Sequence, residues 1–291
     1  MLIDEPETIP IQHKLDSLYL VGDYSSAIEQ TLILLNYYKN KKDLKGQIVC
    51  FNHLGDYLRA SGNRTESLES LYSALALNAQ LHDSLLLAQT YNYLGAIFFE
   101  QDYPRYMDST THYAGLSMDI AVRHKDEKLI YSDLNLLGMA EMGKDKLDSA
   151  LVYLDQALEM VKRISPIDEP LVLCNMAGIY YRKNDLTIAK KLALRAFQKA
   201  KHDNVNTYIR MASTLLEKFN LLEGNYREAY YYLSELSLYT RNFMDEKIEG
   251  RMASMKEQFR QAEENANVQK ELNQRRLLTT FLFILFGLAL V

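Results

Sequence analysis

Apolar residues recur along most of the chain at positions i, i+3, i+4 and i+7, the spacing of one face of an α-helix. Leu54 and Leu58 follow this spacing, and so do Leu68, Leu71 and Leu75 a few residues later. A short polar stretch that contains Gly, Asn or Asp separates such segments. The pattern therefore predicts units built of a helix, a tight turn and a second helix.

Two short signatures repeat along the chain. The first, an Asn-x-Leu-Gly-like tetrad, begins at Asn52, Asn92, Asn135, Asn175 and, in degenerate form, Thr214. The second places a small residue just after the turn, and these small residues lie 39 to 42 positions apart: Ala27, Ser67, Ser109, Ala150, Ala189 and Ala229. The spacing predicts six units of about 40 residues, which must stack because one unit cannot bury its apolar face alone.

Small residues in both signatures indicate that the two helices of each unit cross closely. We expect the contact to lie at Gly55, Gly95 and Gly138 on the first helices and at Ala150, Ala189 and Ala229 on the second. A large side chain at such a crossing would overpack it at a cost of about 1–3 kcal/mol.

These signatures resemble the tetratricopeptide repeat (TPR) family, over residues 11–240. The period of about 40 exceeds the family's usual period of about 34, and Phe51, Tyr91, Leu134 and Leu173 replace its usual Trp. The long units look like the kinesin-light-chain type. The resemblance implies an all-α, right-handed solenoid of about six helix hairpins over residues 11–243, after an N-terminal extension at 1–10.

The charged segment 244–276 follows the repeats and carries a heptad seam. Its apolar residues are Ile248, Met252, Met255, Phe259, Ala262 and Ala266. We expect one long helix. It either caps the open end of the solenoid or forms a coiled coil that joins two copies through 245–276.

The final segment, 277–291, holds fifteen residues without a charge and follows Arg275-Arg276. We expect a transmembrane helix that is cut within the span, since fifteen residues reach only about 22 Å against roughly 30 Å for a bilayer core. The expected protein is a single-pass membrane protein. The side on which the repeats lie stays open: the arginine pair and the absence of a visible signal peptide favour the cytoplasm, whereas similar membrane-bound bacterial regulators carry such arrays outside it.

Composition and motifs exclude several functions. The net charge of −5 gives no footprint for nucleic acid. The two cysteines, Cys50 and Cys174, show no CxxC spacing and lie in apolar helical stretches, so we expect no disulfide framework. No motif of a nucleotide-binding, metalloprotease or hydrolase site occurs, and the six histidines are scattered. We expect no cofactor, no metal site and no catalytic residue.

One set of polar residues points to binding. The resemblance implies that part of each first helix faces a concave groove, where Asn52, Asn92, Asn135 and Asn175 would form a ladder. An Asn amide both donates and accepts, so it can pair with the backbone of an extended peptide of any sequence. Alternatively, each Asn hydrogen-bonds a neighbouring helix and stabilises stacking. Other expected groove residues are Asp56, Arg59, Phe99, Met139, Met142 and Tyr181, of types that suit adaptable peptide binding.

The sequence thus predicts a protein- or peptide-binding module. By its domain order it resembles the sensory part of a bacterial inner-membrane regulator whose output domain is missing. A tail-anchored cytosolic TPR adaptor is the main alternative, and a TPR-fused enzyme is the third.

Overall fold

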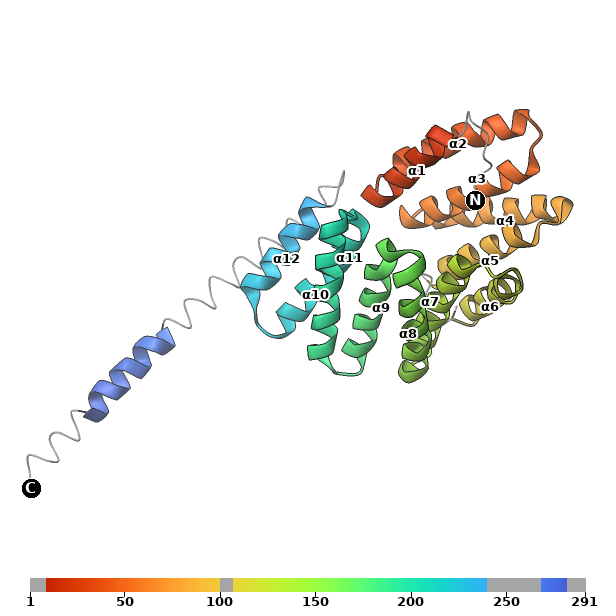
Figure 1. The fold of residues 1–291 in the computed structure, drawn as a ribbon. Coiled ribbons are helices and arrows are strands. Elements are labelled where there is room, and N and C mark those ends of the chain that lie inside the picture. Colours follow the sequence, from red (N-terminus) through yellow and green to blue (C-terminus); the bar gives the residue numbers. More distant parts are fainter. Residues whose placement is uncertain (1–8, 100–106, 240–267, 282–291) are drawn as a thin grey trace, which may run out of the picture. The chain divides into compact units, whose positions relative to one another are not determined.

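The computed structural model describes residues 9–99, 107–239 and 268–281 (Figure 1). The described residues are helical, with short turns and no strand. They divide between two units, Met1–Leu215 and Leu216–Val291. The all-helical architecture of the prediction is confirmed.

Twelve α-helices lie between Ile9 and Leu238 in the described part of the chain. They are α1 (Ile9–Val21), α2 (Tyr24–Asn40), α3 (Leu44–Ala60), α4 (Arg64–Leu81), α5 (Ser84–Phe99), α6 (Met107–His124), α7 (Glu127–Gly143), α8 (Leu147–Ile164), α9 (Glu169–Arg182), α10 (Leu186–Asp203), α11 (Asn206–Leu222) and α12 (Tyr226–Leu238). A short 3-10 helix, η1 (Pro166–Asp168), precedes α9.

Consecutive helices pack as pairs. In the first unit the pairs are α1/α2, α3/α4, α5/α6, α7/α8 and α9/α10. In the second unit, Leu221 near the end of α11 packs against Ala229, Leu233 and Leu236 of α12. The six pairs coincide with the six units that the 40-residue period predicts.

The turns inside the pairs follow from their residue types. Gly22, Gly62 and Gly224 adopt left-handed φ angles of 78°, 87° and 73°, which Gly takes at no steric cost. An Asp or Asn follows each of them, and the Asp23 carboxylate accepts from the Ser26 N–H at the start of α2. Each of these turns therefore ends one helix at a Gly, and in the first turn the Asp23 side chain also caps the next helix, whereas Asn63 and Asn225 make no side-chain cap bond.

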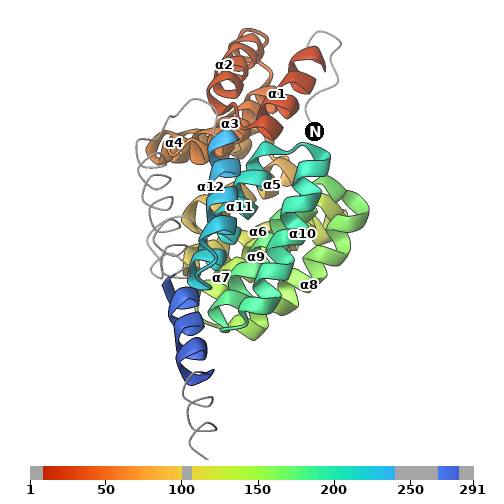
Figure 2. The same ribbon diagram turned by 90° about the vertical axis from the view of Figure 1, so that its left-hand side faces the viewer.

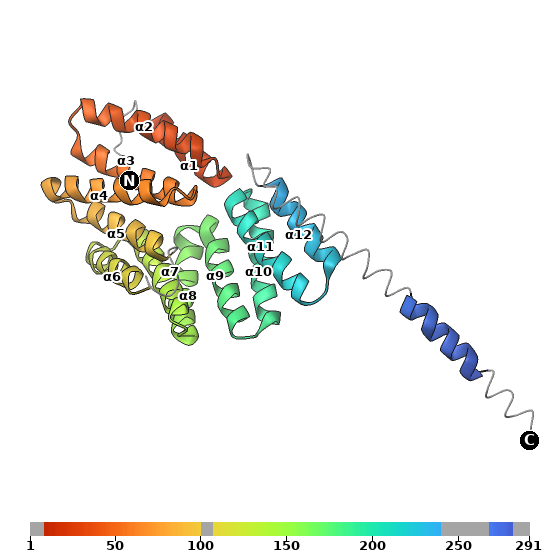
Figure 3. The same cartoon turned by 180° about the vertical axis from the view of Figure 1, so that it is seen from behind.

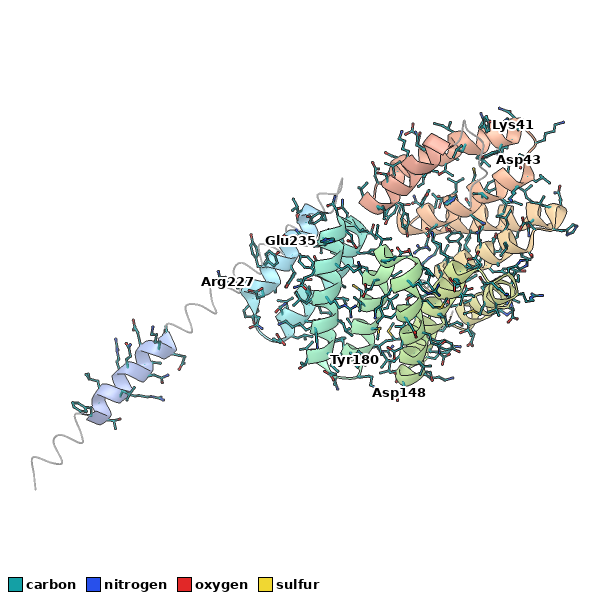
Figure 4. All side chains as sticks on the ribbon, viewed as in Figure 1. Lys41, Asp43, Asp148, Tyr180, Arg227 and Glu235 are labelled. Carbon is teal, nitrogen blue, oxygen red and sulfur yellow. The ribbon has the colours of Figure 1, made fainter. Side chains whose placement is uncertain are left out.

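The turn between the first two pairs also ends in a side-chain cap. Asp43, labelled in Figure 4, caps α3 by accepting from the Gly46 N–H at 3.1 Å. Asp148, labelled in the same figure at the start of α8, pairs with Lys183 just beyond α9. This surface ion pair joins the α7/α8 hairpin to the α9/α10 hairpin.

The small residue of each unit lies three positions after the start of the second helix, and all six are fully buried. They are Ala27, Ser67, Thr110, Ala150, Ala189 and Ala229. Five of these were predicted. In the third unit the prediction of Ser109 was wrong: α6 begins at Met107, so Thr110 faces the crossing and Ser109 is half-buried.

Two of the three predicted glycine crossings are tight. A Cβ atom on Gly55 would lie 2.5 Å from Leu71 Cδ2, and one on Gly138 would lie 2.9 Å from Leu154 Cδ2. A Cβ on Gly95 would meet its neighbours at ordinary distances of 3.4 Å or more. The glycines at 55 and 138 therefore permit a helix approach that no other residue allows without a shift.

The first helices of the pairs form the inner layer of the first unit. Helix α3 packs on α5, α5 on α7, and α7 on α9, whereas the second helices α2, α4, α6 and α8 each pack between the first helices that flank them. Direct contact between successive first helices means that the stack curves towards them. Figures 2 and 3 show the helices from the side and from behind.

The C-terminal predictions fall largely on residues outside those that the structure describes. These include the heptad seam from 248 to 266 and the part of the predicted span from 282 to 291. Residues 268–281 form a helix whose apolar side chains are exposed, Phe281 among them. Among the described residues, no helix has the length and apolar character needed to cross a membrane.

Candidate functional site

The four ladder asparagines lie in α3, α5, α7 and α9, the inner layer of the first unit. Asn52, Asn92, Asn135 and Asn175 are each at most 9% exposed. Their amides bond to neighbouring first helices. Asn52 Oδ1 accepts from Thr90 Oγ1 at 2.8 Å. The ladder therefore links successive hairpins by hydrogen bonds, which is the second of the two roles considered from the sequence.

The other ladder bonds are of the same kind. Asn92 Nδ2 donates to Asp133 Oδ1 at 2.7 Å and to Ser132 Oγ at 3.0 Å. Asn175 Nδ2 donates to Asn135 Oδ1 at 2.8 Å. The hydrogen bond between Asn175 and Asn135 does not use the Nδ2 donor of Asn135 or the Oδ1 acceptor of Asn175. A role of these two groups towards a peptide backbone stays a prediction.

Asp133, whose carboxyl group accepts the hydrogen bond from Asn92, is fully buried. Burial raises its pKa from 3.8 to about 7, although hydrogen bonding to the Asn92 amide acts in the opposite direction. Keeping this carboxyl group ionised in the inner layer therefore costs free energy of folding. This group could not be recognised from the sequence, since its hydrogen-bond partner Asn92 lies 41 positions away.

Asp56 and Arg59, two predicted groove residues, form an ion pair at 2.6 Å on α3. Tyr19 of α1 and Tyr93 of α5 flank the pair. The Asp56 carboxylate is the main cause that raises the pKa of Tyr19, while burial and then Asp56 raise the pKa of Tyr93. Both phenols therefore stay protonated and offer hydroxyl groups beside a neutralised ion pair.

A pocket of about 360 Å³ lies between α7, α9 and α11 within the first unit. Its walls are mostly apolar, and three of the lining residues were predicted to face the groove: Met139, Met142 and Asn175. Five were not: Cys174, Gly178, Met211, Thr214 and Leu215. The predicted Phe99 and Tyr181 are half-buried near the ends of α5 and α9, outside this lining.

Gly178 explains why the pocket lies there. It stands eight residues before the second helix of its pair, the position that Asp56 and Met139 occupy in theirs. The crossing position in this pair belongs to Ala177, which is fully buried. A Cβ atom on Gly178 would find no heavy atom within 4 Å. The absent side chain therefore opens space on the inner layer instead of admitting a close helix.

Cys174 in the pocket wall is not a reactive group. It is a free, buried thiol, as is Cys50. Burial raises the pKa of both thiols to about 12, so the nucleophilic thiolate is not populated near neutral pH. Within the described residues, no cluster of three His, Cys, Asp or Glu side chains could hold a metal ion.

A second polar network lies at the edge of the inner layer. Asp168 of η1 accepts from the hydroxyl groups of Tyr131 at 3.0 Å, Tyr208 at 2.7 Å and Ser165 at 2.6 Å. The carboxylate thereby ties α7 to the start of α11 across the beginning of α9. This network holds the three helices that frame the pocket.

The start of α11 also meets the first hairpin. Asn206 Nδ2 donates to the Val21 carbonyl at 3.2 Å, and the hydroxyl groups of Tyr24 and Thr207 lie 3.2 Å apart. These contacts join residues that lie about 185 positions apart in the sequence, almost the full length of the first unit. The inner layer curves far enough for its two ends to touch, which bounds the concave face.

Comparison with known proteins identifies the fold. No protein-family model matches the chain, and no curated protein does. Among solved structures, NprR in complex with its cognate peptide NprX is similar, with 18% identity and a TM-score of 0.57 over 88% of this chain and 72% of that one.

Two further structures agree with this one. BtubC from P. vanneervenii has 18% identity and a TM-score of 0.52, over 76% of this chain and 89% of that one. A signal-transduction ATPase with a tetratricopeptide repeat sensor, from Pyrococcus horikoshii, has 15% identity and a TM-score of 0.50, over 79% of this chain and 38% of that one. At such identities the likeness concerns the fold. The chain is a helical-repeat protein with a TPR-like fold.

Proposed function

We propose that the chain binds an extended peptide on the concave inner layer of its first unit. The observation that carries this proposal is the open pocket between α7, α9 and α11, which adjoins unused amide groups of the asparagine ladder. An extended peptide presents alternating amide groups and side chains, and such a surface matches both. The NprR structure, a similar fold with a peptide bound, supports the proposal.

The proposed role is sensory. Peptide binding on the inner layer favours one curvature of the stack over another, and it shifts the population towards that curvature by as much as the affinities differ. The contact between Asn206 and the first hairpin is one element that such a change would make or break. The P. horikoshii protein, whose tetratricopeptide repeats are described as a sensor, supports this reading by its fold.

Peptide binding is tested with a displayed library of random octapeptides selected against the full chain. Titration calorimetry of a selected peptide should show saturable 1:1 binding. Met139→Lys places a charge on the inner layer and should weaken binding at least tenfold. Val152→Lys on α8, where the wild-type side chain is 58% exposed, is the matched control and should leave the affinity unchanged.

Two outcomes contradict the proposed function. Either the library yields no binder, or Met139→Lys and Val152→Lys have equal effects on every selected peptide. Circular dichroism of both variants checks that the helices are retained.

We further propose that this module belongs to a single-pass membrane regulator and is anchored through 277–291. The uncharged run after Arg275-Arg276 supports this. Carbonate extraction of bacterial membranes that contain the full chain is the test. The chain should stay in the pellet, and a variant that lacks 277–291 should be released. Release of both forms would overturn membrane anchoring while leaving peptide binding intact.

A further inference from the structure

The pocket between α7, α9 and α11 has the composition of a side-chain subsite. Met139, Met142 and Met211 contribute three flexible thioether side chains, which adapt to the shape of an apolar group. Leu215 and the neutral thiol of Cys174 complete the apolar wall. No charged side chain lines it.

The polar groups at the pocket are equally specific. Asn175 lines the pocket and is held by its bond to Asn135, which uses one donor and one acceptor. The remaining acceptor of Asn175 and the remaining donor of Asn135 are complementary to the N–H and C=O groups of one peptide unit. An apolar cavity beside one donor and one acceptor fits an amino-acid residue in a chain, and it fits neither a purely apolar molecule nor an ion.

We propose that this pocket is the anchor subsite of the peptide-binding face, and that it takes one large apolar side chain (Leu, Ile, Met or Phe) of an extended peptide. Gly178 determines this specificity. It is the inner-layer position at which the side chain is missing, and the space above it is open. The inference rests on the proposed function and names the residue class that the function recognises.

The decisive variant is Gly178→Leu, which fills the subsite from its own wall. Because nothing lies within 4 Å of a Cβ at this position, the new side chain begins in open space, and circular dichroism checks that the helices are retained. Gly115→Leu is the matched control: Gly115 lies on α6 in the outer layer, and its Cβ would also find nothing within 4 Å. The two variants carry the same substitution into open space, inside and outside the subsite.

Octapeptides selected against the wild-type full chain should share one large apolar residue. Their affinity should fall about tenfold to a hundredfold for Gly178→Leu, the loss expected when such a side chain can no longer be buried. It should be unchanged for Gly115→Leu. Replacing the shared residue of the peptide by Ala should cause a similar loss with the wild type and almost none with Gly178→Leu.

A spectroscopic readout locates the contact. In the full chain labelled at the methionine methyl groups, addition of a selected octapeptide should shift the signals of Met139, Met142 and Met211. The signal of Met107, a buried methionine of α6, should stay in place.

The outcomes separate the two proposals. If the selected peptides bind Gly178→Leu and the wild type equally, or share no apolar residue, the subsite is refuted while peptide binding stands. If no octapeptide binds, both fail.

Discussion

The close helix crossing at Gly138 and the open space at Gly178 predict different effects on stability when each glycine is replaced by Ala. Both glycines lie on inner-layer helices, and neither is among the residues with positive φ. Replacing Gly by Ala within a helix contributes about 1 kcal/mol of stability through propensity alone. This gain is common to both positions, so the difference between the two variants reports the packing.

The packing terms differ strongly. At Gly138 an Ala Cβ would lie 2.9 Å from Leu154 Cδ2 and 3.1 Å from the carbonyl oxygen of Ala150, which is backbone and cannot rotate away. Overpacking of this kind costs about 1–3 kcal/mol. At Gly178 the new methyl group meets nothing. Gly178→Ala should therefore be more stable than Gly138→Ala by about 1–3 kcal/mol.

Thermal and urea unfolding followed by circular dichroism measure this difference. For a chain of this size it corresponds to about 2–12 °C in Tm. Because repeat arrays can unfold in stages, the comparison uses the same probe for both variants. Gly115→Ala, which also enters open space, should behave like Gly178→Ala. Equal stabilisation by Gly138→Ala and Gly178→Ala would refute the assignment of Gly138 to a helix crossing.

Two further predictions follow from buried charge and from the C-terminal segment. The pKa of Asp133 is about 7 in the fold and 3.8 in the unfolded chain, so between these pH values the folded state binds more protons than the unfolded state. The contribution of Asp133 to stability therefore falls as pH rises from about 4 to about 7, by up to about 4 kcal/mol. Asp133→Asn should remove that loss, so its stability relative to the wild type should be greatest above pH 7; a constant difference from pH 4 to 8 would contradict the assignment. Sedimentation should show that residues 1–276 self-associate and that deletion of 245–276 abolishes this self-association. If both forms are monomers, the coiled-coil prediction is wrong and the alternative, that the segment caps the solenoid, is favoured.

The repeat architecture could be predicted because its determinants are local. The apolar spacing, the turn residues at Gly22, Gly62 and Gly224, and the small residue after each turn all lie within one unit. The one wrong small residue, Ser109, lies in the unit whose sequence between the two signatures is longer than in the other units. Extra residues there shift the register of the second helix, and the sequence does not show by how much.

The site was only partly predictable, for a different reason. An Asn amide suits a peptide backbone and a neighbouring helix equally well, and the partners of Asn52 and Asn92 lie about 40 residues away. The pocket depends on a missing side chain at Gly178 and on residues of α11, where the signature is degenerate. Met139 and Met142, which were predicted to face the groove, line this pocket, and their role in binding stays a prediction.

Photo-crosslinking can show directly whether a peptide binds on the inner layer. A selected octapeptide that carries a diazirine in its apolar side chain is bound to the full chain and irradiated, and the modified residues are mapped by mass spectrometry. We expect modification on the inner faces of α7, α9 and the first half of α11, and we expect unlabelled peptide to compete with it. Modification confined to the outer helices α8 and α10, or to residues 268–281, would contradict it.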